Sequence, residues 1–129
     1  MTTQRDIIAI IEDDLGLGSA LGVLLSAYGY QSKLFSSAEE FIAVAATSNA
    51  ACLLVDVELG GMSGLNLARR LIAAGVKYPL IFMTGSHNDE YRRQATDLGC
   101  VAYLKKPYPS AILMEAITAA TGIRPNRVD

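Results

Sequence analysis

The sequence lacks the long apolar runs that a membrane protein needs. Hydrophobic residues make up 51% of the 129-residue chain, but no apolar stretch approaches the ~20 residues that span a bilayer. Residues 1–6 also lack the charged start and the apolar block of a signal peptide. We therefore expect a cytoplasmic protein without a membrane segment.

Clusters of positive charge and of cysteine are missing as well. The formal net charge is −2, and lysine and arginine occur in no group larger than a pair. Because nucleic-acid binding requires a basic face, we expect this chain not to bind nucleic acid directly. The two cysteines, Cys52 and Cys100, lack the spacing of metal ligands, and we expect both to be buried, reduced thiols in or beside strands.

The sequence does contain a regular alternation of apolar runs and stripes at helical spacing. Four of the five predicted strands are continuous apolar runs, which is typical of a parallel sheet covered on both faces. The predicted strands are 6–12, 30–35, 51–56, 79–84 and 100–105, and the predicted helices are 15–28, 37–46, 64–74, 88–98 and 109–121.

This alternation predicts an α/β fold, a doubly wound (βα)5 three-layer sandwich around a five-stranded parallel sheet. The length suits one domain, which should occupy residues 1–121. Residues 122–129 are then a C-terminal tail or the start of a linker. Right-handed crossovers bring the carboxyl ends of all strands to one edge of the sheet, where such folds concentrate their chemistry.

Two local patterns concern the first two helices. Ser37, with Glu40 three residues later, predicts a capping box at the start of helix 37–46. The first helix contains Gly16, Gly18 and Gly22, and each glycine costs about 1 kcal/mol relative to alanine in a helix interior. Either a close approach of helix and sheet or a mobile first turn explains these glycines.

Four of the five strand ends carry groups that can take part in chemistry. Glu12-Asp13-Asp14 follows the first strand, Asp56 ends the third, Thr84 ends the fourth and Lys105-Lys106-Pro107 ends the fifth. Two carboxylates about 4 Å apart repel by about 4 kcal/mol at an effective dielectric constant of about 20. A divalent cation relieves that repulsion, and an all-oxygen ligand set suits Mg²⁺.

A lysine near these acids keeps one carboxylate ionised and pairs with an incoming anion. An ionised carboxylate beside Mg²⁺ is a competent nucleophile toward phosphorus, and its attack produces an aspartyl phosphate. The strand-end residues together therefore indicate phosphoryl chemistry that depends on Mg²⁺.

In their order along the chain, these motifs resemble the receiver domain of two-component response regulators. The resemblance implies that Asp56 is the phosphoacceptor and that Glu12 and Asp13 are the acidic pair. It also implies that Asp13 and Asp56 bind Mg²⁺ directly and that Glu58 contributes its backbone carbonyl. Asp14 matches a less specific position after the pair.

The resemblance assigns roles to three further residues and to the fold. Thr84 is implied as the switch hydroxyl, Tyr103 as the switch aromatic and Lys106 as the lysine that pairs with the phosphoryl group. The strand order 2-1-3-4-5 is taken from the resemblance, and a cis bond between Lys106 and Pro107 is implied by it.

The resemblance also implies the partners. The phosphodonor is a histidine kinase or a histidine phosphotransfer protein. Phosphorylation changes the face made by segments 88–98, 100–105 and 109–121, which then binds a downstream output protein, acts on a missing output domain or forms a homodimer.

Two short stretches of the sequence are most similar to receivers of the nitrogen-fixation-regulator group, which usually precede a helix-turn-helix domain. Gly60 departs from the family pattern, because proline is common at that position, and the glycine predicts a looser loop that affects the phosphoryl lifetime. The segments that carry this resemblance are Phe35-Ser36-Ser37-Ala38-Glu39-Glu40-Phe41 and Gly61-Met62-Ser63-Gly64-Leu65.

Three alternatives stay open at this point. One is a Mg²⁺-dependent phosphohydrolase with an aspartyl-phosphate intermediate, although Glu58 stands where such enzymes typically have an aspartate. Another is a receiver-like interaction module that is never phosphorylated. The third is a fragment of a longer DNA-binding regulator.

Overall fold

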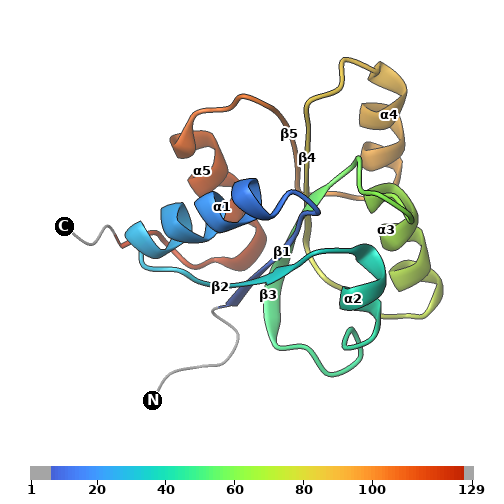
Figure 1. Ribbon diagram of the computed structural model, residues 1–129, viewed down its shortest axis with the longest axis horizontal. Helices are drawn as coiled ribbons and strands as arrows, with labels where there is room; N and C mark the ends of the chain where they lie inside the picture. Colours follow the sequence, from blue (N-terminus) through green and yellow to red (C-terminus); the bar gives the residue numbers. More distant parts are fainter. Residues whose placement is uncertain (1–6, 127–129) are drawn as a thin grey trace.

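Five parallel strands form one sheet in the order β2-β1-β3-β4-β5 (Figure 1) in a computed structural model, which describes residues 7–126. The order agrees with the one that the receiver resemblance implies. The strands are β1 (Ile7–Ile11), β2 (Gln31–Phe35), β3 (Ala50–Asp56), β4 (Leu80–Thr84) and β5 (Ala102–Lys105).

Helices cover both faces of the sheet and make the predicted three layers. In Figure 1, α1 and α5 lie on one side of the sheet, and α2, α3 and α4 lie on the other. Two apolar clusters of buried residues fill the two spaces between sheet and helices. The helices are α1 (Leu15–Ala27), α2 (Ala38–Ile42), α3 (Gly64–Ala73), α4 (Asp89–Asp97) and α5 (Ser110–Thr121).

The burial of each strand follows its place in the sheet. The central strands β1, β3 and β4 are almost entirely buried, as their continuous apolar runs predict. The edge strand β2 instead alternates between exposed and less exposed residues. The carboxyl ends of β1, β3 and β4 therefore emerge from the middle of the sheet, where two layers of helices flank them.

The predicted second helix, 37–46, is too long. The α-helix ends at Ile42, because the next residues form tighter turns in which the N–H groups of Val44 and Ala45 donate to carbonyls three residues earlier. Ser37 caps α2 by accepting the N–H of Glu40 at 3.0 Å. The Glu40 carboxylate accepts the Ser36 hydroxyl instead, so only half of the predicted capping box forms.

Close packing explains one glycine of α1. A Cβ on Gly18 would lie 2.6 Å from Cδ1 of Leu34 in β2, so a side chain at this position would require the Leu34 side chain to move. Gly16 and Gly22 leave ordinary contact distances of 3.4 Å. The close-approach alternative therefore accounts for Gly18 only.

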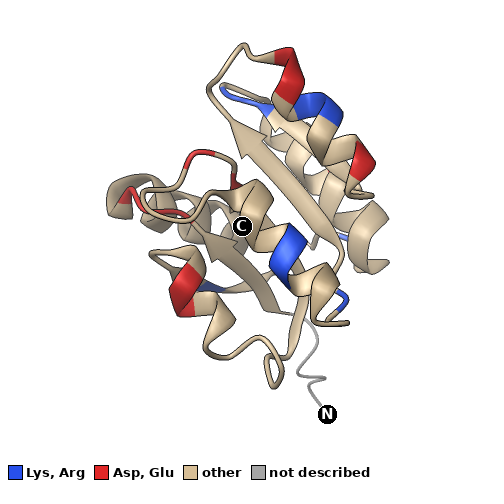
Figure 2. Cartoon of the chain, turned by 90° about the vertical axis from the view of Figure 1, so that its right-hand side faces the viewer, with Lys and Arg blue, Asp and Glu red and all other residues tan. Residues whose placement is uncertain are grey.

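Helix α4 is attached to the rest of the molecule by a small apolar surface. Its acidic residues lie at both ends and its basic residues lie between them (Figure 2). Only Ala95 is fully buried, whereas α3 buries five residues along its length. Arg93 pairs with Glu90 and Asp97 on the exposed side, and exposed pairs of this kind contribute little stability.

The segment after α5 turns back onto the start of β2. The N–H of Asn126 donates to the carbonyl of Tyr28 at 2.7 Å, and the Tyr30 hydroxyl donates to the carbonyl of Ile123 at 2.9 Å. The remaining predicted tail, residues 127–129, and the first predicted strand residue, Asp6, lie outside the described residues.

Both cysteines are free thiols, as predicted, but Cys100 is only half-buried, so its predicted burial is wrong. Cys52 is buried in β3, and this burial raises its pKa to about 12, so the thiol is unreactive at neutral pH. Within residues 7–126, none of the helices is long and apolar enough to span a bilayer.

Candidate functional site

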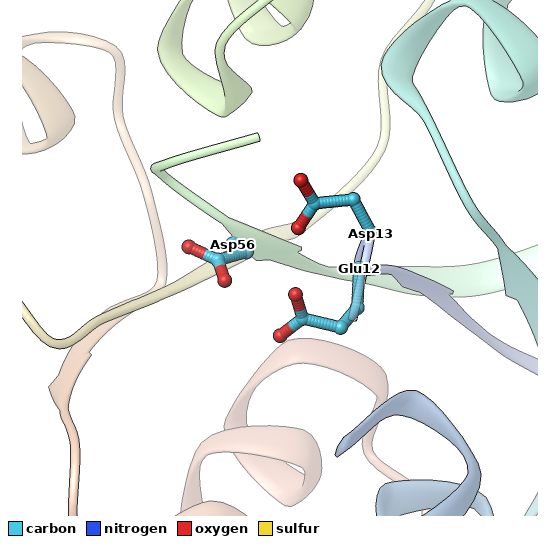
Figure 3. A group of neighbouring side chains, drawn as sticks. All are labelled: Glu12, Asp13 and Asp56. Atoms are coloured by element: carbon cyan, nitrogen blue, oxygen red, sulfur yellow. The ribbon is translucent and has the colours of Figure 1, made fainter. Parts of the chain in front are cut away.

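Three acidic side chains from two neighbouring strands meet at the carboxyl edge of the sheet (Figure 3). Glu12 and Asp13 directly follow β1, and Asp56 is the last residue of β3. One carboxylate oxygen from each lies within 4.8 Å of the other two. The convergence that the sequence predicts is therefore present, and it follows from the pairing of β1 with β3.

Two hydrogen bonds orient the carboxylate of Asp56, which is only 6% exposed. Its Oδ1 accepts the N–H of Glu58 at 2.8 Å, and its Oδ2 accepts Nζ of Lys106 at 2.9 Å. Both bonds fix the direction of the carboxylate, and the one from Lys106 joins two charged groups.

Lys106 also lies 3.2 Å from Oε1 of Glu12 and so connects two buried acids. Burial lowers the pKa of Lys106, but the hydrogen bond and the charge of Asp56, together with the charge of Glu12, raise it overall. One ammonium group therefore stays charged between two carboxylates, at the end of β5 where the sequence predicts it.

Glu12 is the most perturbed acid of the site. Its side chain is 1% exposed, and burial, followed by the charge of Asp56, raises its pKa to about 7. The neighbouring Asp13 is exposed and accepts the N–H of Gly60 at 2.9 Å through Oδ2.

The donor set fits Mg²⁺. It consists of oxygens only, and its negative charge exceeds what the single ammonium of Lys106 offsets. Repulsion from Asp56 already disfavours ionisation of Glu12, and a divalent cation would remove this repulsion.

The backbone at Gly60 is tied to the site. Because its N–H donates to Asp13, the glycine supplies a hydrogen bond that proline cannot make. This bond joins Gly60 across 47 residues of sequence to the end of β1. The looser loop predicted from the departure at Gly60 stays a prediction.

Gly64, the first residue of α3, allows this helix to start close behind Asp56. A Cβ at Gly64 would lie 2.3 Å from the carbonyl oxygen of Asp56 and 2.8 Å from Cγ1 of Val55. Only glycine fits this contact, so the start of α3 and the phosphoacceptor candidate are packed together directly.

Thr84, at the end of β4, is fully buried, and its hydroxyl is engaged. Oγ1 donates to Oε1 of Glu58 at 3.0 Å and accepts the N–H of Ser86 at 3.0 Å. The carbonyl of Thr84 accepts the N–H of Lys106 at 2.7 Å, which ties the ends of β4 and β5 together.

Tyr103 lies in β5 beside the exposed side of α4. Its ring packs against the apolar cluster on the α3 and α4 side of the sheet, and the guanidinium of Arg92 lies 4.7 Å from the ring centroid. The hydroxyl is buried and has no hydrogen-bond partner among residues 7–126. Desolvation accordingly raises the pKa of Tyr103.

Sequence reasoning missed three contacts around the site. The Thr84 hydroxyl donates to the Glu58 side chain, and Arg92 stacks on Tyr103. Asp14 caps α1, because its Oδ1 accepts the N–H of Leu17. An acid before a helix is a readable capping signal. The other two contacts join different elements and leave no local pattern. The Lys106–Pro107 bond is cis, as the resemblance implies.

A family model described as the response regulator receiver domain matches residues 8–118. The chain belongs to this family. This receiver domain is 32% identical over 127 residues to the response regulator protein TmoT of Ectopseudomonas mendocina. It is 31% identical over 120 residues to the transcriptional regulatory protein FixJ of Bradyrhizobium diazoefficiens.

These matches cover 98% and 93% of the receiver domain but only 58% of each relative, so the chain spans little more than half the length of these curated proteins. Among solved structures, the crystal structure of FixJ-N superposes with a TM-score of 0.85 at 29% identity, covering 90% of this chain and 93% of that one. A response regulator receiver protein from Burkholderia phymatum superposes with a TM-score of 0.79 at 30% identity, covering 92% and 97%.

The family and the geometry agree on the general function. The chain is a receiver domain of two-component signalling, and its acidic cluster is consistent with a phosphoacceptor site. Receiver domains generally bind Mg²⁺ at an acidic pocket, and this chain has such a cluster.

Proposed function

We propose that Asp56 accepts a phosphoryl group from a phosphohistidine on a histidine kinase or a histidine phosphotransfer protein. The observation that carries the proposal is the pair of hydrogen bonds on Asp56, from the Glu58 N–H and the Lys106 ammonium. They hold the buried carboxylate in a fixed orientation, as a nucleophile requires.

In the transfer, an oxygen of Asp56 forms a bond to phosphorus while the bond from phosphorus to the donor imidazole breaks. The electron pair of the broken bond returns to the imidazole. Lys106, 2.9 Å from Oδ2, offsets charge on the phosphoryl oxygens as they arrive. Asp13, Asp56 and the Glu58 carbonyl are the proposed Mg²⁺ ligands, with Glu12 beside them, and the ion supplies further charge neutralisation.

Thr84 and Tyr103 would then change position in response to phosphorylation. The Thr84 hydroxyl moves toward the new phosphoryl group, and Tyr103 turns inward into the space that it leaves. The face made by α4, β5 and α5 repacks as a result, and a pre-existing equilibrium shifts. The small apolar attachment of α4 supports this step, because moving the helix exposes little buried surface.

The output follows from that face. A downstream protein, an output domain beyond this chain or a second phosphorylated copy binds there. The length of the relatives supports an output domain. We further propose that the protein works in the cytoplasm, where a kinase could reach it.

The phosphohydrolase alternative loses support at Glu58. An acid–base role requires that its carboxylate face the leaving group, but the carboxylate accepts the Thr84 hydroxyl. We therefore propose a signalling domain that catalyses only its own phosphorylation and dephosphorylation.

Replacement of the nucleophile tests the proposal. With a small-molecule phosphodonor and Mg²⁺, the wild-type chain should gain the mass of one phosphoryl group, measured by intact-protein mass spectrometry. Asp56→Asn should gain none, and the surface variant Asp97→Asn should be labelled like wild type. Labelling that persists in Asp56→Asn would contradict the assignment, and steady release of phosphate would favour the phosphohydrolase. A wild-type chain that is never labelled would favour the interaction module.

A further inference from the structure

The Thr84 hydroxyl has one proton, and that proton is already used. Oγ1 donates it to Oε1 of Glu58 at 3.0 Å, while the N–H of Ser86 occupies the acceptor side. A hydroxyl can donate to only one partner at full strength. Thr84 therefore cannot donate to a phosphoryl group on Asp56 until it releases Glu58.

Glu58 contacts both functional residues, by different atoms. Its backbone N–H donates to Oδ1 of Asp56 at 2.8 Å, and its carboxylate accepts from Thr84. The side chain is on the exposed loop after β3, whereas Thr84 is fully buried at the end of β4. The contact thus joins two strand ends that a phosphoryl group on Asp56 would also have to join.

We propose that the Glu58 side chain is a latch that holds the Thr84 hydroxyl in its unphosphorylated orientation. Glu58 is a positioning residue in this role, since it acts on phosphorylation through Thr84. The inference rests on the proposed function, because Thr84 must be the group that responds to the phosphoryl group. It is separate from the role proposed for the Glu58 backbone carbonyl as an Mg²⁺ ligand.

The hydrogen bond between Thr84 and Glu58 affects the free energy of the change from the unphosphorylated to the phosphorylated conformation. A phosphoryl oxygen must replace the carboxylate as the acceptor of the Thr84 proton, so the hydrogen bond to Glu58 is lost on switching. Removing the Glu58 carboxylate abolishes that loss and favours the switched state. Because the Glu58 side chain is exposed, we expect the binding of a phosphoryl mimic to tighten by roughly three- to tenfold, the effect of one modest hydrogen bond.

The charge of Glu58 is a separate effect that must be distinguished from the latch. A carboxylate near Asp56 repels any incoming anion, whether or not it holds Thr84. Glu58→Gln removes this charge but keeps an oxygen that can accept the Thr84 proton, and it should show a smaller gain than Glu58→Ala. Glu39→Gln is the matched control, because this exposed acid faces the same loop at Gly61 and does not contact Thr84 in the described structure.

A double-mutant cycle tests the latch, with trifluoroberyllate and Mg²⁺ as the phosphoryl mimic and the dissociation constant measured by NMR titration. Glu58→Ala should tighten binding in the wild-type and Thr84→Ser backgrounds, which keep the hydroxyl. It should tighten binding less in Thr84→Val, which has the shape of threonine without the proton, because only the charge effect of Glu58 remains there. An equal gain in the Thr84→Val background would show a pure charge effect and overturn the latch.

A measurement on the mimic-free protein separates this proposal from the proposed function. Three-bond couplings report the χ1 rotamers of Thr84, and the Ser86 amide shift reports the neighbouring hydrogen bond. Both should change in Glu58→Ala and stay unchanged in Glu39→Gln. Unchanged Thr84 rotamers would overturn the latch, even if Asp56 is phosphorylated normally. Failure of the wild-type chain to bind the mimic would count against the proposed function, while the rotamers would still decide whether Glu58 holds Thr84.

Discussion

At the scale of single residues, the site contains two buried acids, Glu12 and Asp56, and the half-buried Lys106. Asp56 and Glu12 share the ammonium of Lys106, at 2.9 and 3.2 Å. One cation between two acids leaves an imbalance of charge. The pKa of Glu12 is raised first by burial and then by the charge of Asp56. The same imbalance favours binding of a divalent cation.

The raised pKa of Glu12 predicts how stability depends on pH. Between its ordinary pKa of 4.5 and its folded value of about 7, the unfolded chain has lost the proton while the folded chain still holds it. The free energy of unfolding should therefore fall as pH rises through this interval. Glu12→Gln should remove on the order of 2 kcal/mol of that fall. Urea unfolding across the interval, in Mg²⁺-free buffer, measures it, and equal slopes for both proteins would contradict the assignment.

At the scale of elements, the helices differ in how firmly they hold the site. Helix α3 begins against the carbonyl of Asp56 and buries five of its residues, so it fixes the position of the proposed nucleophile. Helix α4 fully buries only Ala95 and carries exposed ion pairs. A rigid helix behind the acceptor and a lightly attached helix at the output face suit a switch.

Gly64→Ala should show how tightly α3 packs on the site. The new Cβ would overlap the Asp56 carbonyl, a backbone atom that cannot rotate away. We expect a loss of roughly 1–3 kcal/mol in the free energy of unfolding, as for other overpacked positions, together with slower phosphoryl labelling. Gly85→Ala is the control, because no atom lies within 4 Å of its added Cβ. A Gly64→Ala protein as stable as this control would contradict the close contact.

At the scale of the whole molecule, the apolar core and the charged site occupy different parts of the sheet. The two apolar clusters lie on the faces of the sheet, whereas the charged site lies at its carboxyl edge. Binding at the edge then adds to the stability of the folded state by mass action.

Mg²⁺ should consequently raise the melting temperature of the protein. At a free concentration tenfold above the dissociation constant, the expected gain is about 1.4 kcal/mol. Asp13→Asn should lose most of this gain, because it removes a proposed ligand, and Asp97→Asn should retain it. Thermal unfolding with the ionic strength held constant measures the difference. A full gain in Asp13→Asn would place the metal site elsewhere.

Much of this molecule could be predicted because the relevant signals are local. Continuous apolar runs such as Ile7–Ile11 identify buried parallel strands, and the handedness of crossovers then brings Asp13, Asp56 and Lys106 to one edge. The strand order required the family resemblance, since no local pattern encodes which strands are neighbours.

The tertiary structure alone decided the contacts between distant segments. The hydrogen bond of Gly60 to Asp13 and the contact of Thr84 with Glu58 depend on side-chain directions and on neighbours far away in sequence. The sequence by itself determined which chemical groups reach the edge of the sheet, because strand periodicity and chirality suffice for that. Only the fold decided which of these groups hold one another, because hydrogen bonds require distances that no spacing along the chain specifies.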